Sequence, residues 1–437
     1  MSGLGLGASA RGSAPLTEAQ RLSVQRRTLA ILATGTILGG LGIGAGFSAG
    51  ALLVTEITGT AALSGFAATM NAVGAAIAGI PLGRLAARRG RRVALATGNL
   101  IAVLGAIAVI ASAALGSGPL LFVGLAVLGI ATAVQLQSRF AAADLAMPGR
   151  RARDLSLVVW SITVGAVVGP NLIGPGANVG VWLGLPPLAG VFAFTLLAQA
   201  AAGAIVWFGL RPDPLLAARE IAAREQAAAA GEASAAAAGG ERTPSAQQRR
   251  DRTRPRASTL VIALVAAAHA VMVAIMAMTP LHITEHGGSI TLVGLTISLH
   301  IAGMYALSPI FGMLTGRIGA VSVILIGFLT LFSAVACTAF AGDSHLVVQT
   351  GLVLLGVGWS AVTVAGAALL TEVTPPDARP RRQGQSDTVM NACGALAGAS
   401  SGALFAFAGF PFLSLVGGFL VAVGIACTLR LLAVLRR

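Results

Sequence analysis

The chain has 437 residues, of which 56% are hydrophobic and only 10% are charged. A soluble domain carries about 25% charged residues, so this composition excludes a soluble enzyme and indicates a membrane protein. The formal net charge is +14, and every basic residue is an arginine. Such a charge could indicate nucleic-acid binding, but these arginines lie between apolar segments, where the positive-inside rule places them. We therefore expect membrane lipid, and no nucleic acid, as a partner.

Apolar segments long enough to cross a bilayer as a helix, which takes about 20 residues, follow one another along the chain. In chain order they are 28–51, 62–83, 93–115, 119–140, 156–176, 187–210, 258–281, 290–313, 320–341, 346–371, 386–408 and 411–434. They predict an all-α polytopic fold of twelve transmembrane helices in two six-helix halves, residues 28–210 and 258–437. Residues 1–27 form a tail, and residues 211–257 form a polar linker.

The arginines lie on one side of this predicted bundle. They occur in the tail, in the linker, at the C-terminus and in the loops after the second, fourth, eighth and tenth segments. The opposite loops contain no arginine and hold Glu56, His282, Glu285, His286, Asp343 and His345. The positive-inside rule then places both termini in the cytoplasm and the protein in the plasma (inner) membrane. We interpret the histidines and acids of the opposite loops as solvated side chains rather than a metal site.

The two halves show an internal repeat at an offset of 229 residues. The repeat continues through charged loops as well as apolar segments, which chance matching of glycines does not explain. Parallel repeats of this kind are found in secondary transporters, with the substrate path near the midplane between them. At this offset Gly83, Arg88 and Gly90 fall on Gly312, Arg317 and Gly319, and Gly165 and Gly169 fall on Gly394 and Gly398.

The loop after the second segment carries a glycine and arginine motif. It reads Gly83-Arg84-Leu85-Ala86-Ala87-Arg88-Arg89-Gly90-Arg91-Arg92, with a weaker copy over Gly312-Met313-Leu314-Thr315-Gly316-Arg317-Ile318-Gly319. This resembles the loop motif of the major facilitator superfamily. The resemblance implies a monomeric transporter without a cofactor, in which the motif gates the cytoplasmic side.

One feature of that motif is missing. The acidic residue that usually latches the two halves together is Ala87 in the first copy and Gly316 in the second. Another carboxylate, from Asp144, Asp154, Asp377 or Asp387, could instead pair with Arg88 or Arg91.

The fifth segment carries a second motif, Gly165-Ala166-Val167-Val168-Gly169-Pro170-Asn171-Leu172-Ile173-Gly174-Pro175. It resembles the antiporter motif of the drug/proton exporters in the same superfamily, except that Pro175 replaces its last glycine. Gly165 and Gly169 would offer a smooth packing face, and Pro170 would bend the helix because it lacks an amide donor. The resemblance implies a seal on the outer side, and ordinary small-residue helix packing is the alternative.

Ionisable side chains inside membrane spans are costly and are usually functional. His300 and His269 lie near the middle of their segments, and the repeat places Asn71 opposite His300. Histidine titrates near neutral pH, so either ring could carry a proton, although a hydrogen bond between helices would also explain it. Glu56 lies at the outer end of the first segment, either at a cavity mouth or in solvent. We take His300, His269, Asn71 and Glu56 as proton-coupling candidates.

The first, fourth, seventh and tenth helices usually line the central cavity in this superfamily. The resemblance therefore makes Gln135, Gln137, Arg139 and Trp359 candidates for substrate contact. Because charged residues are scarce, we expect an apolar or amphipathic substrate. The leading hypothesis is a non-enzymatic exporter that exchanges hydrophobic small molecules for protons, as in multidrug efflux. The alternatives are a uniporter or symporter for a small nutrient and a non-transporting receptor of the same fold.

Overall fold

The computed structural model describes residues 18–59, 63, 66–147, 149–236 and 246–436. Within these ranges, the side chains of 18, 42–48, 51, 166–167, 170–171, 228–236, 246–256, 290–291 and 434–436 are not described. The described chain consists of helices joined by short turns, in agreement with the predicted all-α fold.

The described part of the first half has eight α-helices and the short 3-10 helices η2 and η3. They are α1 (Glu18–Thr58), α2 (Phe66–Arg89), α3 (Arg91–Leu115), α4 (Gly118–Leu128), α5 (Ile130–Asp144), α6 (Arg151–Val168), η2 (Gly169–Leu172), α7 (Ile173–Trp182), η3 (Pro187–Gly190) and α8 (Val191–Gly209). The linker begins with α9 (Pro214–Ala236).

The second half follows the linker. Its helices are α10 (Ala246–Glu285), α11 (Ile290–Tyr305), α12 (Ser308–Ile318), α13 (Ala320–Ala339), α14 (His345–Val373) and α15 (Arg379–Arg436). The backbone of α15 leaves helical geometry at Ala408 and Gly409, where φ at the glycine is 75°. This kink falls between the last two predicted segments, so α15 contains both.

Nine helices of the described chain are long and apolar enough to cross a membrane. The remaining predicted spans have local explanations. Segment 28–51 lies within α1, segment 156–176 is broken into α6, η2 and α7, and α15 holds two spans on either side of its kink. The twelve-helix, six-plus-six architecture is therefore confirmed.

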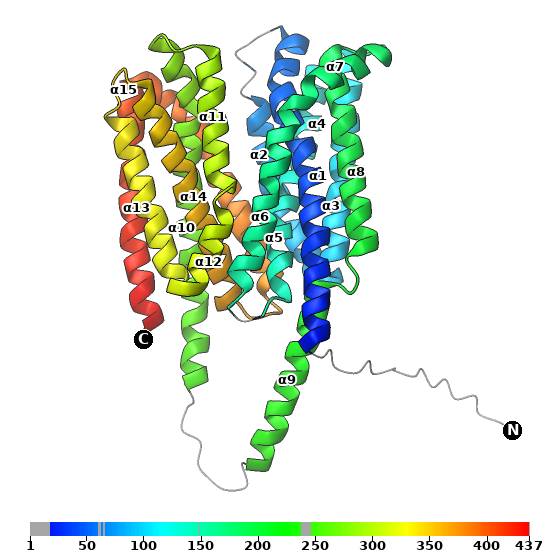
Figure 1. Ribbon diagram of the computed structural model, residues 1–437, viewed down its shortest axis with the longest axis vertical. Coiled ribbons are helices and arrows are strands. Elements are labelled where there is room, and N and C mark those ends of the chain that lie inside the picture. The colour runs from blue at the N-terminus through cyan, green and yellow to red at the C-terminus, as the bar shows by residue number, and fades with distance from the viewer. Residues whose placement is uncertain (1–17, 60–62, 64–65, 148, 237–245, 437) are drawn as a thin grey trace, which may run out of the picture.

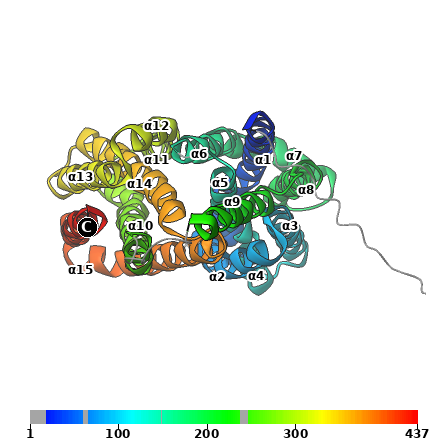
Figure 2. The same ribbon diagram turned by 90° about the horizontal axis from the view of Figure 1, so that it is seen from below.

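The helices form two bundles that stand side by side (Figure 1). The start of α1, the end of α15 and the whole of α9 lie at one end of the pair. We call this end the arginine side, because the arginine-bearing loops also lie there. Seen from that end, α2 lies beside α15 and α6 beside α12, and both pairs are in contact (Figure 2). These two seams join the halves.

Small residues let the helices of each half pack closely, while large apolar side chains face outward. Phe328 and Phe192 are fully buried in the second and first halves, respectively. In contrast, Phe332, Leu197 and Phe419 are more than half exposed, as expected for side chains that contact lipid. The repeat also appears in the backbone, since Gly90 and Gly319 precede α3 and α13 with φ of 88° and 86°.

Candidate functional site

The α2–α15 seam is built on glycine. A Cβ atom added to Gly83 would lie 2.5 Å from the backbone oxygen of Pro380 and 3.1 Å from Cα of Gly384. One turn earlier, a Cβ on Gly79 would lie 2.5 Å from Oγ1 of Thr388. That hydroxyl donates to the backbone oxygen of Ala76 at 2.9 Å. The loop-motif glycine Gly83 therefore lies where α2 of one half touches α15 of the other.

The α6–α12 seam repeats this arrangement with the second copy of the motif. A Cβ on Gly312 would collide with Oγ of Ser156 and would lie 2.7 Å from the backbone oxygen of Ala152. Ser308, one turn earlier in α12, donates to the backbone oxygen of Ser156 at 3.2 Å. The repeat-related glycines Gly83 and Gly312 thus allow close approach at the two seams.

The arginines of the motif divide into buried and exposed groups. Arg91 is fully buried, and its guanidinium donates to Asp144 at 2.7 Å and to Oε1 of Gln137 at 2.9 Å. It also donates to Gln383 of α15, across the seam. Arg92 places its guanidinium 5.0 Å from the ring centre of Trp207. Asp144, one of the four proposed carboxylates, therefore pairs with Arg91. Arg84, Arg88 and Arg317 are exposed.

Asp387 holds the second buried ion pair, and this pair joins the two halves. Its carboxylate accepts from Nη2 of Arg139 at 2.8 Å and from Nε2 of Gln137 at 3.0 Å. Asp387 is fully buried, and Arg139 is 3% exposed. Gln383, one turn earlier in α15, donates to the hydroxyl of Thr371 at 3.1 Å. The predicted cavity residues Gln137 and Arg139 therefore belong to a polar network at the arginine side, which the substrate-contact prediction did not anticipate.

His300 lies inside the second half, away from that network. Its Nδ1 is 2.7 Å from the backbone oxygen of Leu352 in α14, so Nδ1 must carry the hydrogen. The other ring nitrogen, Nε2, is buried without a partner among the described residues. Asn71 is bound within the first half, where its Oδ1 accepts from Thr132 at 3.0 Å. Glu56 is exposed.

His269 takes part in an aromatic cluster with the tenth-segment tryptophan. Nε1 of Trp359 donates to Nδ1 of His269 at 3.0 Å, and the ring of Tyr305 meets Trp359 edge-on at 5.9 Å. A Cβ on Gly394 would lie 2.8 Å from Nε2 of His269, so this ring lies against the backbone of α15. Gln135 is buried in the first half, where it donates to the backbone oxygen of Thr36 at 3.3 Å.

The antiporter-like motif packs inside the first half. A Cβ on Gly165 would lie 2.7 Å from Cα of Gly40, so α6 touches the backbone of α1 there. Helix α6 ends at Val168, and the 3-10 helix η2 begins at the buried Gly169. The α-helix is therefore interrupted next to Pro170, whose own side chain is not among the described ones. Gly174 and Pro175 are exposed in α7. The sealing role predicted for this motif stays a prediction.

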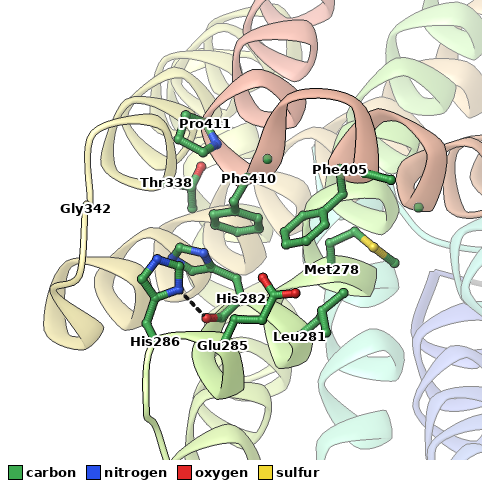
Figure 3. Close-up of a pocket in the computed structure, with 13 residues that line it drawn as sticks. Met278, Leu281, His282, Glu285, His286, Thr338, Gly342, Phe405, Phe410 and Pro411 are labelled. Carbon is green, nitrogen blue, oxygen red and sulfur yellow. Dashed lines mark hydrogen bonds between the residues drawn. The ribbon is translucent and has the colours of Figure 1, made fainter.

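A pocket of about 600 Å³ opens on the opposite side, in the second half. Its walls come from α10, the end of α13 with the turn after it, and the kinked part of α15 (Figure 3). The ring of His282 stacks on Phe410 at 4.4 Å, and Nδ1 of His286 bonds to the backbone oxygen of His282 at 2.8 Å. Among the described residues, no group of three or more His, Cys, Asp or Glu is placed to hold a metal ion.

Sequence reasoning missed the pairing of Arg139 with Asp387. Asp387 begins a predicted span and was considered only as a partner for Arg88 or Arg91. A signal was present in the spacing, because Gln383, Asp387 and Asn391 recur every four residues and therefore share one face of α15. A polar face on an otherwise apolar helix indicates a buried polar partner.

Comparisons with known proteins agree with this architecture. The family model described as Major Facilitator Superfamily matches residues 32–281 and 259–437. The chain is 37% identical over 399 residues to the uncharacterized MFS-type transporter YdeG of Bacillus subtilis, covering 91% of this chain and 90% of that one. It is 26% identical to the riboflavin transporter RfnT of Brucella anthropi, covering 90% and 94%.

Among solved structures, the fold resembles the proton:xylose symporter XylE with a TM-score of 0.73. The identity is 15%, and the match covers 94% of this chain and 96% of that one. The matched family model extends over most of both halves, and the two seams join those halves at the glycine-bearing ends of α2 and α12. The chain therefore belongs to the Major Facilitator Superfamily of membrane transporters.

Proposed function

We propose that this transporter exports apolar or amphipathic small molecules in exchange for protons, with Asp387 as the proton-binding residue. The observation that carries the proposal is the ion pair of Asp387 with Arg139, which is buried and joins the two halves at 2.8 Å. We interpret the structure as the state that is closed on the arginine side, which we predict to face the cytoplasm.

Protonation of Asp387 would weaken the closed state selectively. A buried charge that loses its partner costs about 3–5 kcal/mol, because the remaining charge is left without compensation. A neutral Asp387 leaves Arg139 buried and unpaired only while the halves are closed. Opening of the arginine side exposes Arg139 to water and removes that cost. Proton binding therefore shifts the population toward the open state.

A route for the proton leads along one face of α15. Asn391 lies one turn beyond Asp387 and donates to its backbone oxygen at 2.8 Å. Gly394, against which the ring of His269 lies, follows on the same side of the helix. Because Nδ1 of His269 accepts from Trp359, Nε2 carries the hydrogen of the neutral ring. In this proposal, His269 would pass protons toward Asp387 from the opposite side.

This mechanism favours antiport over symport. A proton alone neutralises Asp387 and opens the arginine side, so the carrier can return without substrate. A symporter would need substrate and proton together before that side opened. The relative named as a riboflavin transporter supports a nutrient as the competing substrate class, so riboflavin belongs in any substrate panel. A receptor of the same fold would show no flux at all.

The test uses everted membrane vesicles whose lumen has been acidified, with a panel of hydrophobic drugs, dyes and riboflavin. We expect some compound to release protons from wild-type vesicles and Asp387→Asn to abolish that release. Asp387→Asn mimics the neutral state, so it should still exchange labelled compound for unlabelled compound across the membrane. Loss of both activities in a folded protein would indicate a structural role for Asp387 instead.

Two further variants serve as controls. Asp154 is also a carboxylate on the arginine side, but it accepts a hydrogen bond from Gln25 of its own half, at 2.7 Å. The variant Asp154→Asn should therefore keep proton release. His300→Asn keeps a hydrogen-bond donor for the backbone oxygen of Leu352, and it should also keep proton release. If His300→Asn abolished proton release and Asp387→Asn did not, the proton site would be His300 and our assignment would be wrong.

A further inference from the structure

The linker helix α9 is fixed at its start to the first half. Asp213, which precedes α9, accepts from the backbone amides of Leu215 and Leu216 at 3.0 and 3.2 Å and so caps the helix. The other oxygen of the same carboxylate accepts from the backbone amide of Arg92, at the start of α3, at 2.8 Å. The start of α9 is thereby held against the motif loop, whose Gly90 leaves room for Asp213.

One side chain of α9 reaches both halves. Nη1 of Arg219 donates to the backbone oxygen of Ala87 in α2 at 2.7 Å, and Nη2 donates to the backbone oxygen of Asp377 at 3.1 Å. Asp377 lies in the turn that leads into α15, so the guanidinium bridges the α2–α15 seam. Seen from the arginine side, α9 runs from the first half toward this seam (Figure 2).

The chemistry of the two acceptors suits a cation. Ala87 lies in the last turn of α2, where the final carbonyl groups have no partner within the helix and carry the negative end of its dipole. The ends of α2 and α15 at this seam are rich in arginine, and the position of Ala87 supplies no carboxylate to offset them. Arg219 binds one backbone oxygen on each side of the seam, and its planar guanidinium can bind both at once.

We propose that Arg219 is a positioning residue that holds the arginine side closed, so that the linker itself is part of the gate. When the halves separate on that side, α2 and α15 move apart, and Arg219 can keep at most one of its two acceptors. Its second hydrogen bond therefore stabilises only the closed state and shifts the population toward it. This role is independent of the substrate and of the residue that binds the proton.

The test measures the closed population directly in the full-length protein. Spin labels at Arg153→Cys on α6 and Ile318→Cys on α12 report the width of the other seam, with Cys337, Cys393 and Cys427 replaced by alanine. Both label sites are exposed and distant in sequence from Arg219. We expect a mostly short distance in the parent protein. Arg219→Ala should raise the ratio of long to short distances roughly tenfold, the effect of losing one hydrogen bond to a charged group.

Arg224→Ala is the matched control, because it removes the same charge from the same helix but contacts Glu220 within α9. It should leave the distance distribution as in the parent. Arg219→Lys keeps the charge but lacks the planar guanidinium that binds two acceptors, so its distance distribution should resemble that of Arg219→Ala. If Arg219→Ala left the distribution unchanged, or if Arg219→Lys matched the parent, the proposal of a two-acceptor bridge would be overturned. A misfolded variant would show in its unfolding temperature.

Discussion

Arg91 shows how a single buried charge depends on its partners. Its guanidinium is fully buried and donates hydrogen bonds to Asp144, Gln137 and Gln383, so nearly all of its N–H groups are bonded. The sequence identified Arg91 from the loop motif and named Asp144 as one possible partner. It could not select Asp144 among four carboxylates, because that choice depends on how α3 packs on α5.

We predict that Arg91→Met destabilises the protein by about 3–5 kcal/mol, because Asp144 is left buried without its counter-charge. The measurement is thermal unfolding in detergent. The double variant Arg91→Met with Asp144→Leu should recover most of the loss, since an apolar pair of similar volume often replaces a buried ion pair at little cost. An unchanged unfolding temperature in the single variant would contradict the pairing.

Among the histidines, the contacts separate two residues that the sequence had both named as proton-coupling candidates. His300 and His269 both lie mid-helix, but His300 is bound to a backbone oxygen of its own half whereas His269 meets Trp359 and the backbone of α15. The sequence shows how far along a helix a residue lies, but it does not show whether the side chain points toward the other half of the protein. We therefore propose a role in proton transfer for His269 and none for His300.

At the scale of helices, the seams depend on glycines that the motif had already marked. The motif predicted Gly83 and Gly312 as gating residues, and the structure brings each against the other half. Their partners, Gly384 and Ser156, carried no motif of their own. Contacts between halves depend on the packing angle of whole helices, which periodicity within one helix does not encode.

We predict that Gly312→Ala opens the α6–α12 seam. The added methyl group would collide with Oγ of Ser156 and crowd the backbone oxygen of Ala152, and such overpacking costs about 1–3 kcal/mol. The cost falls on the closed state alone, so the open population should rise about fivefold or more.

The same spin-label pair on Arg153→Cys and Ile318→Cys measures this change. Gly294→Ala is the control, because a Cβ at Gly294 meets no atom within 4 Å. Equal distance distributions for the two variants would show that the α6–α12 seam tolerates a methyl group and does not set the closed state.

At the scale of the whole molecule, the sequence predicted the architecture well. Apolar length, the 229-residue repeat and the arginine loops gave the twelve spans and their division. The finer shape was not predictable. The sequence showed two spans where α15 continues through the kink at Ala408 and Gly409. It also showed residues 211–257 only as a polar linker, because the capping by Asp213 and the reach of Arg219 depend on the loops onto which α9 folds.

We predict that the distal linker is dispensable for transport. Replacing residues 228–245 by a glycine and serine segment of equal length leaves Asp213 and Arg219 in place, so flux in vesicles should stay within about twofold of the parent, since such a segment acts only as a flexible tether. A receptor that signals through this segment would lose its output instead. Loss of flux with normal folding would show that the distal linker acts directly in transport.

If Asp387 binds the proton, as we propose, its depth would link the carrier to the electrical state of the membrane. It lies two turns beyond the start of α15, about 12 Å along the helix at 1.5 Å per residue. A proton that reached it from the opposite side would therefore have crossed most of the voltage drop before the arginine side opened. Moving one charge across 100 mV changes its energy by about 2.3 kcal/mol. The membrane potential would therefore help to set how often the arginine side opens.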